Sequence, residues 1–88
     1  MSKYRIEFAK TFNKSLSKLE KETQKQVKTT IANFLNNANA SDVIKLKGHK
    51  DSYRIRSGSY RIIFRQYDNK LLILFLDVKH RKEVYRDL

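Results

Sequence analysis

Arginine side chains recur at alternate positions in the second half of this 88-residue chain. Arg54 and Arg56 are two residues apart, and Arg61 and Arg65 follow a Ser-Gly-Ser segment at 57–59 that is typical of a hairpin turn. Because residues two apart on a strand share a face, we expect these four side chains on one face of a hairpin. Guanidinium is always charged and binds phosphate through a bidentate fork. The spacing therefore predicts a surface that binds a phosphate backbone.

The overall charge also favours an anionic partner. Lysine and arginine number 20 against nine acidic residues, which gives a net charge of +11, and nucleic acid is the commonest partner of so basic a domain. The alternative is a solvated surface with no partner, but such surfaces usually mix both signs of charge. Further side chains that we expect to bind RNA are Lys45, Lys47, Arg65, Lys79 and Lys82.

The residue types exclude most kinds of catalytic site. The absence of cysteine excludes a disulfide framework, and the two histidines and scattered aspartates do not form a zinc or magnesium site, so we expect neither metal nor cofactor. RNA cleavage by the neighbouring 2′-hydroxyl needs only in-line positioning, charge stabilisation and proton transfer.

Two residues near the C-terminus are candidates for the remaining steps of such a reaction. His80 could transfer a proton, because histidine commonly does so near neutral pH, and Tyr85 could stack on a splayed base. The alternatives are a surface histidine at a strand end and a core aromatic that anchors the C-terminal segment. His49 is more typical of a loop residue than of a catalyst.

Hydrophobic periodicity indicates the elements that position these residues. Residues 3–8 alternate as a strand does, and two apolar stripes at helical spacing follow. We expect Thr23 to cap the second helix. The stripes are Phe8, Phe12, Leu16 and Leu19, then Val27, Ile31, Phe34 and Leu35. Strands are predicted at 43–47, 52–56, 60–67 and 70–78, the last of them buried on both faces, and residues 81–88 are predicted as a short helix or tail.

This order of elements predicts a single domain over residues 1–88, of the α+β class. The N-terminal strand and a helical hairpin would pack on one face of an antiparallel sheet of about four strands, with a short C-terminal helix. The arginines would project from the open face. The longest apolar run, residues 71–76, is far shorter than the roughly 20 residues of a membrane span, and we expect a cytoplasmic protein.

Short motifs in the second half of the chain match a known pattern, and the order of the predicted elements matches it along essentially the whole chain. The motifs are KLKG at 45–48, YRIR at 53–56, YRII at 60–63, VKHR at 78–81 and VYR at 84–86. Their order and spacing resemble the RelE family of bacterial and archaeal toxins, in the RelE/ParE superfamily. The resemblance implies the toxin of a type II toxin–antitoxin system that cleaves mRNA on the ribosome without a metal. It also implies a cognate, RelB-like antitoxin that holds the toxin inactive.

The resemblance also implies roles for single residues. Arg54 and Arg56 stand where the family carries basic residues that contact the scissile nucleotide. Arg61 stands at the phosphate-stabilising arginine. Arg81 stands at a second arginine, which protonates the leaving oxygen or stabilises the transition state. Tyr85 stands at the tyrosine that stacks on the substrate base.

One departure from the family leaves the general base open. Relatives often carry lysine where this chain has Arg54 and Arg56, and arginine is a poor base because it stays charged. Either His80, which stands where several subfamilies place a catalytic histidine, acts as the base, or the arginines make the 2′-hydroxyl more acidic. The alternatives to a ribonuclease are a ParE-like toxin that inhibits DNA gyrase and a non-catalytic RNA-binding or degenerate toxin.

Overall fold

Two helices and five strands make up the part of the chain that the computed structural model describes, residues 3–37 and 42–82. In chain order they are β1 (Arg5–Phe8), α1 (Lys10–Ser17), α2 (Lys21–Asn36), β2 (Val43–Lys45), β3 (Ser52–Ser57), β4 (Tyr60–Tyr67) and β5 (Leu72–His80). The α+β class predicted from the sequence is confirmed. The predicted C-terminal helix lies mostly outside the described residues.

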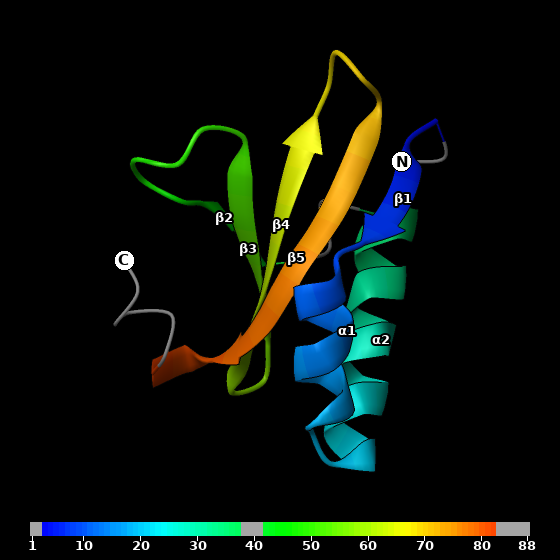
Figure 1. Cartoon of the computed structure of the whole chain (residues 1–88), viewed down its shortest axis with the longest axis vertical. Coiled ribbons are helices and arrows are strands. Elements are labelled where there is room, and N and C mark those ends of the chain that lie inside the picture. The colour runs from blue at the N-terminus through cyan, green and yellow to red at the C-terminus, as the bar shows by residue number, and fades with distance from the viewer. Residues whose placement is uncertain (1–2, 38–41, 83–88) are drawn as a thin grey trace.

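All five strands form one sheet in the order β1-β5-β4-β3-β2 (Figure 1). The pairings of β2 to β5 are antiparallel, but β1 pairs with β5 in parallel, from Arg5 opposite Leu72 to Phe8 opposite Phe75. The expectation that the N-terminal strand packs on a four-stranded antiparallel sheet is therefore wrong. A strand needs partners for its backbone groups, and the edge of β5 supplies them to β1.

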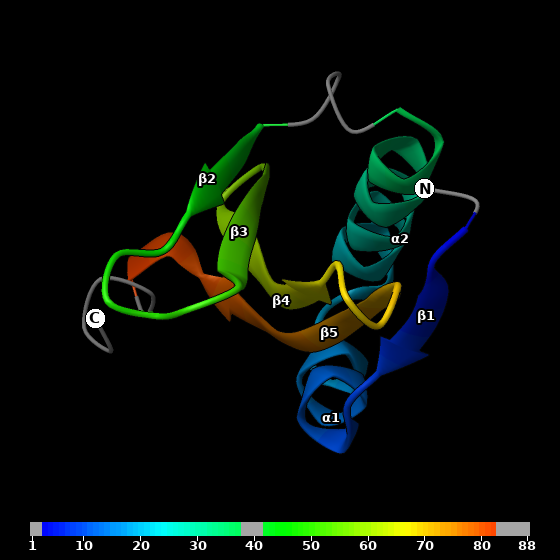
Figure 2. The same cartoon turned by 90° about the horizontal axis from the view of Figure 1, so that it is seen from above.

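The two helices lie together on one side of the sheet and leave its other face uncovered (Figure 2). Buried side chains from both layers meet between them, and Ile55, Ile62 and Val78 lie opposite one another on three adjacent strands. The hydroxyls of Thr30 and Ser57, 2.8 Å apart, join α2 to the end of β3. Within the described ranges, no helix is long and apolar enough to cross a membrane.

The second helix begins before the residue predicted to cap it. Its N-terminal flanking residue is Glu20, no side chain caps it, and Thr23 already lies in the first turn. The side chain of Gln24 donates a hydrogen bond to the carbonyl of Leu19 at 2.9 Å, which links the start of α2 to the connection from α1. Backbone and local polar contacts thus replace the expected threonine cap.

An irregularity in β5 decides which side chains face the helices. Ile63 lies opposite Asp77 but the next residue, Phe64, lies opposite Phe75, so Leu76 is an extra residue in β5. Such a bulge reverses the alternation of the strand beyond it. The core therefore takes odd-numbered residues before the bulge and even-numbered ones after it. The expectation of a strand buried on both faces is wrong, because Leu72, Leu74 and Leu76 are only half-buried.

A polar contact ties the N-terminus to the β4–β5 turn. The hydroxyl of Tyr4 donates to Asp68 Oδ1 at 2.6 Å, and the side chain of Gln66 donates to the same oxygen at 3.0 Å. These bonds, Tyr4 first, hold the pKa of Asp68 below its usual range. Conversely, the hydrogen bond to Asp68 raises the pKa of Tyr4.

We predict that Tyr4→Phe lowers stability by an amount that depends on pH. The contribution of Asp68 is present above the ordinary aspartate pKa and is lost as the pH falls through the lowered value. The contribution of Tyr4 to stability is present below the ordinary tyrosine pKa and is lost as the pH rises through the raised pKa of the folded state. Urea denaturation from about pH 2 to about pH 11 should show a difference from the wild type that shrinks at both ends.

The matched control for this prediction is Tyr67→Phe, because the hydroxyl of Tyr67 contacts Arg65 rather than a carboxylate. Its difference from the wild type should not shrink on the acid side. A Tyr4→Phe difference that stays constant over the whole range would contradict the assignment.

Candidate functional site

Three of the predicted arginines meet at one small cavity on the uncovered face of the sheet. Arg54, Arg56 and Arg61 line it together with Asp42 and Ile44. Arg56 lies directly opposite Arg61 across β3 and β4, and the neighbouring residues Ile55 and Ile62 form a buried pair. Since side chains alternate along a strand, that core pair forces the arginines to the other face. The cavity measures about 10 Å³, roughly the room of one water molecule.

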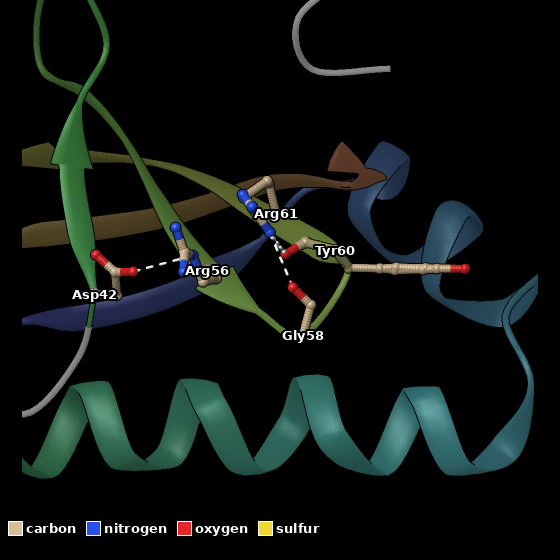
Figure 3. A network of polar contacts seen from close by, with 5 residues as sticks. All are labelled: Asp42, Arg56, Gly58, Tyr60 and Arg61. Carbon is tan, nitrogen blue, oxygen red and sulfur yellow. Dashed lines mark hydrogen bonds and ion pairs between the residues drawn. The ribbon is translucent and has the colours of Figure 1, made fainter. Parts of the chain in front are cut away.

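Arg61 is held in place by the turn that precedes it. Its side chain is buried, with 7% of the residue exposed, and Nη1 donates to the carbonyl oxygens of Gly58 at 3.1 Å and Tyr60 at 2.9 Å (Figure 3). Gly58 has a φ of +60°, which glycine adopts without strain. Both acceptors are neutral, so these bonds orient the guanidinium without neutralising it. This suits a group that must meet an anion in a fixed position.

Arg56 contacts the one acidic side chain among the residues that line this cavity. Its Nε lies 3.1 Å from Asp42 Oδ2, and its backbone N–H donates to the backbone carbonyl of Asp42 at 3.1 Å (Figure 3). The sequence analysis missed Asp42. Its position follows from the register of β2 on β3. Val43 lies opposite Ile55, so Asp42, the residue before Val43, lies beside Arg56.

Two further predicted cations share the uncovered face, at different distances from the cavity. Lys79 lies opposite Arg61 on β5, directly beside the arginine cluster. Arg65 lies four residues along β4, roughly 14 Å away at about 3.4 Å per residue, and its Nη1 lies 3.4 Å from the hydroxyl of Tyr67. Arg65 is therefore on the predicted face but outside the cluster.

The end of β5 lies beside the turn that holds Arg61. The backbone N–H of Arg81 donates to the carbonyl of Ser59 at 2.8 Å, and both Arg81 and Lys82 are exposed. The backbone at Arg81 thus lies beside the turn that orients Arg61. Tyr85, the other predicted residue of the C-terminal segment, lies outside the described residues.

The structure does not bring His80 to the arginines. It lies opposite Tyr60, on the helix-covered side of the sheet, with the two rings 5.4 Å apart and nearly perpendicular. In Figure 3 the side chain of Tyr60 extends away from Arg61. The bulge in β5 causes this placement, because it puts Lys79 rather than His80 on the arginine face.

The remaining predicted lysines belong to the β2–β3 loop. Lys45 lies opposite Tyr53 and so faces the helix side, and Lys47 follows the end of β2. Both line an open hollow of about 490 Å³ formed by residues 45–50.

A third hollow, of about 410 Å³, lies over the helices and is mostly apolar, with Phe8, Phe12, Leu16, Ile31 and Leu35 among its lining residues. Of the three, the arginine cavity is the one lined by guanidinium groups, each of which can bind a phosphate through two parallel hydrogen bonds.

We predict that the arginine cluster destabilises the fold by charge repulsion. Salt screens the repulsion between guanidinium groups, so added sodium chloride should raise the unfolding free energy of the wild type. In Arg61→Met this salt-induced increase should be smaller, because one of the repelling charges is gone. The reduction should be on the order of 0.5–1 kcal/mol between low and physiological salt. Arg65→Met, which removes the same charge outside the cluster, should change the salt dependence less. Equal salt dependence in the two variants would contradict the prediction.

Comparison with known proteins agrees with the resemblance read from the sequence. A family model described as "ParE toxin of type II toxin-antitoxin system, parDE" matches residues 6–85. The chain is 36% identical to "Toxin RelE3" of Methanocaldococcus jannaschii, over 92% of this chain and 94% of that protein.

Solved structures of antitoxin–toxin complexes have the same fold. The toxin chain of the RelB–RelE complex from Methanococcus jannaschii aligns with a TM-score of 0.76 and 35% identity, covering 93% of this chain and 98% of the other. The archaeal RelE–RelB complex from Pyrococcus horikoshii gives a TM-score of 0.72 and 30% identity, with 90% and 96% covered.

Proposed function

Because the chain belongs to the RelE family of toxins of type II toxin–antitoxin systems, we propose that it is a metal-independent mRNA endonuclease that acts with the ribosome. The observation that carries this proposal is the arginine cavity. Arg54, Arg56 and Arg61 line a single small space on the uncovered face, and one of them is already oriented by neutral acceptors. A phosphorane carries more charge than the phosphate it forms from, and oriented cations stabilise that added charge.

The proposed reaction is attack of a ribose 2′-hydroxyl on the adjacent phosphorus. The 2′-hydroxyl loses its proton to a general base or to water, and its oxygen forms a bond to phosphorus. The bond to the 5′-oxygen of the next nucleotide breaks, and that oxygen takes up a proton to become a hydroxyl. Arg61 and Arg56 would contact the non-bridging oxygens, and Arg54 would hold the 2′-oxygen side of the nucleotide. Arg81, beside the turn, would face the leaving 5′-oxygen, and Tyr85 would stack on the base. The ribosome would hold the mRNA in line for attack.

The antitoxin and the ribosome follow as proposed partners. The relatives in the solved complexes are paired with antitoxins named RelB, and we propose a RelB-like antitoxin for this chain. An acidic segment covering the arginine face would both neutralise the charge and block the cavity. Ribosomal RNA is a dense polyanion that attracts a protein of net charge +11. A ribosome-dependent toxin would act in the cytoplasm, and we propose that location.

We predict that arginines of the cavity are needed for cleavage and that Arg65 is not. Arg61→Ala and Arg56→Ala should each lower the single-turnover rate on programmed ribosomes by about 100-fold or more, because each removes transition-state charge stabilisation. Arg65→Ala, on the same face but outside the cavity, should stay within about three-fold of the wild type. Mapping of mRNA ends measures all three, and equal losses in the three variants would argue against the cavity as the active site.

The role of His80 is tested separately through the pH dependence of the rate. A histidine that transfers a proton shapes the pH–rate profile near neutrality. Since His80 packs against Tyr60 on the helix side, we expect His80→Gln to leave the profile unchanged. A flattened profile with an unchanged fold would restore His80 as the general base.

A gyrase-inhibiting toxin is the second candidate, because the family model that matches is described by a ParE toxin. The two functions separate on expression of the protein in cells. Cut mRNA without DNA damage signalling supports the ribonuclease, and intact mRNA with DNA damage signalling supports the gyrase inhibitor. Intact mRNA with normal growth points to a degenerate toxin.

A further inference from the structure

Asp42 places a negative charge where the arginine cavity would have to bind one. It lines the cavity with the three arginines, and its carboxylate contacts Arg56 Nε at 3.1 Å. A carboxylate oxygen on a guanidinium makes the same contact as a non-bridging phosphate oxygen, because both accept hydrogen bonds from the planar fork. The free protein therefore already holds an anion of its own at one of the three arginines.

The size of the cavity makes this contact consequential. About 10 Å³ leaves room for roughly one water, which is too little for a phosphate group with its oxygens. A phosphate cannot enter between the lining side chains as they stand, so contact with all three arginines at once requires one of these side chains to move. Arg61 is fixed by two carbonyls, whereas the side chains of Asp42 and Arg56 are 51% and 61% exposed. An ion pair this exposed is weak and is the contact most easily opened.

We propose that Asp42 is an internal competitor for the substrate phosphate, which the RNA must displace from Arg56. The proposal rests on the phosphate-binding part of the proposed function. A ligand binds in the cavity only if its binding energy exceeds the cost of displacing the Asp42 carboxylate from Arg56. A strand held in place with several phosphates provides enough binding energy to displace the carboxylate, and an isolated phosphate does not. Asp42 would thus make the cavity selective for RNA that is presented in a fixed position.

The direct test is binding of a 2′-O-methylated RNA of about ten nucleotides, which lacks the attacking hydroxyl and stays intact. Fluorescence anisotropy compares the wild type with Asp42→Asn, and we expect the variant to bind about 3- to 10-fold more tightly. The matched control is Asp68→Asn, which removes the same charge at the far end of the sheet and still offers an oxygen to Tyr4. It should stay within about two-fold of the wild type.

A double-mutant cycle shows whether Asp42 acts through Arg56. In an Arg56→Ala background, Asp42→Asn should give no more than about a two-fold gain, because the contact that it opens is gone. Asp42→Glu, which keeps the charge, should bind like the wild type. Circular dichroism and thermal unfolding of each variant confirm that the fold is kept.

The outcomes separate this proposal from the proposed function. If Arg61→Ala weakens RNA binding but Asp42→Asn binds no better than Asp68→Asn, competition by Asp42 is overturned and the phosphate site stands. If Asp42→Asn binds more weakly, Asp42 positions Arg56 instead, and competition is again overturned. If Arg61→Ala binds as tightly as the wild type, the cavity is not a phosphate site and both proposals fall.

Discussion

The pairing of β3 with β4 places two positive charges directly opposite each other, Arg56 and Arg61, and the rest of the site depends on it. Like charges in that position destabilise a sheet. The adjacent step of the same hairpin is the fully buried pair Ile55 and Ile62, so the apolar core fixes the register. A shift of one residue would expose that pair and bury charges, which the fold resists. The core thus holds together side chains that repel one another.

Several smaller features manage the charge that this register creates. The carbonyls of Gly58 and Tyr60 orient Arg61, and Asp42 balances Arg56. The bulge in β5 adds Lys79 to the arginine face and turns His80 to the helices. Together they give a cavity that is rich in cations, with Arg61 held by two backbone carbonyls on one side and the exposed ion pair of Arg56 with Asp42 on the other.

The sequence was sufficient for features that depend on local periodicity. A strand alternates with a period of two, so Arg54, Arg56 and Arg61 could be assigned to one face. The buried stripe of the second helix was predicted equally well, whereas Phe8, which was assigned to the first helical stripe, lies in β1 and is 45% exposed. The sequence was insufficient for features that depend on long-range pairing. The parallel partner of β1, the contact of Asp42 with Arg56 and the bulge at Leu76 all require the register between distant strands. The placement of His80 was missed for the same reason.

The proposed role of the oriented arginines is to promote attack by the RNA's own 2′-hydroxyl, and the chemistry of the cut ends distinguishes this attack from hydrolysis. Purified protein would be added to programmed ribosomes and the termini of the mRNA fragments analysed. Attack by the 2′-oxygen leaves a 2′,3′-cyclic phosphate on one fragment and a 5′-hydroxyl on the other, which is the result expected here. Fragments with a 3′-hydroxyl and a 5′-phosphate would contradict the account, because they require attack by water or another external nucleophile.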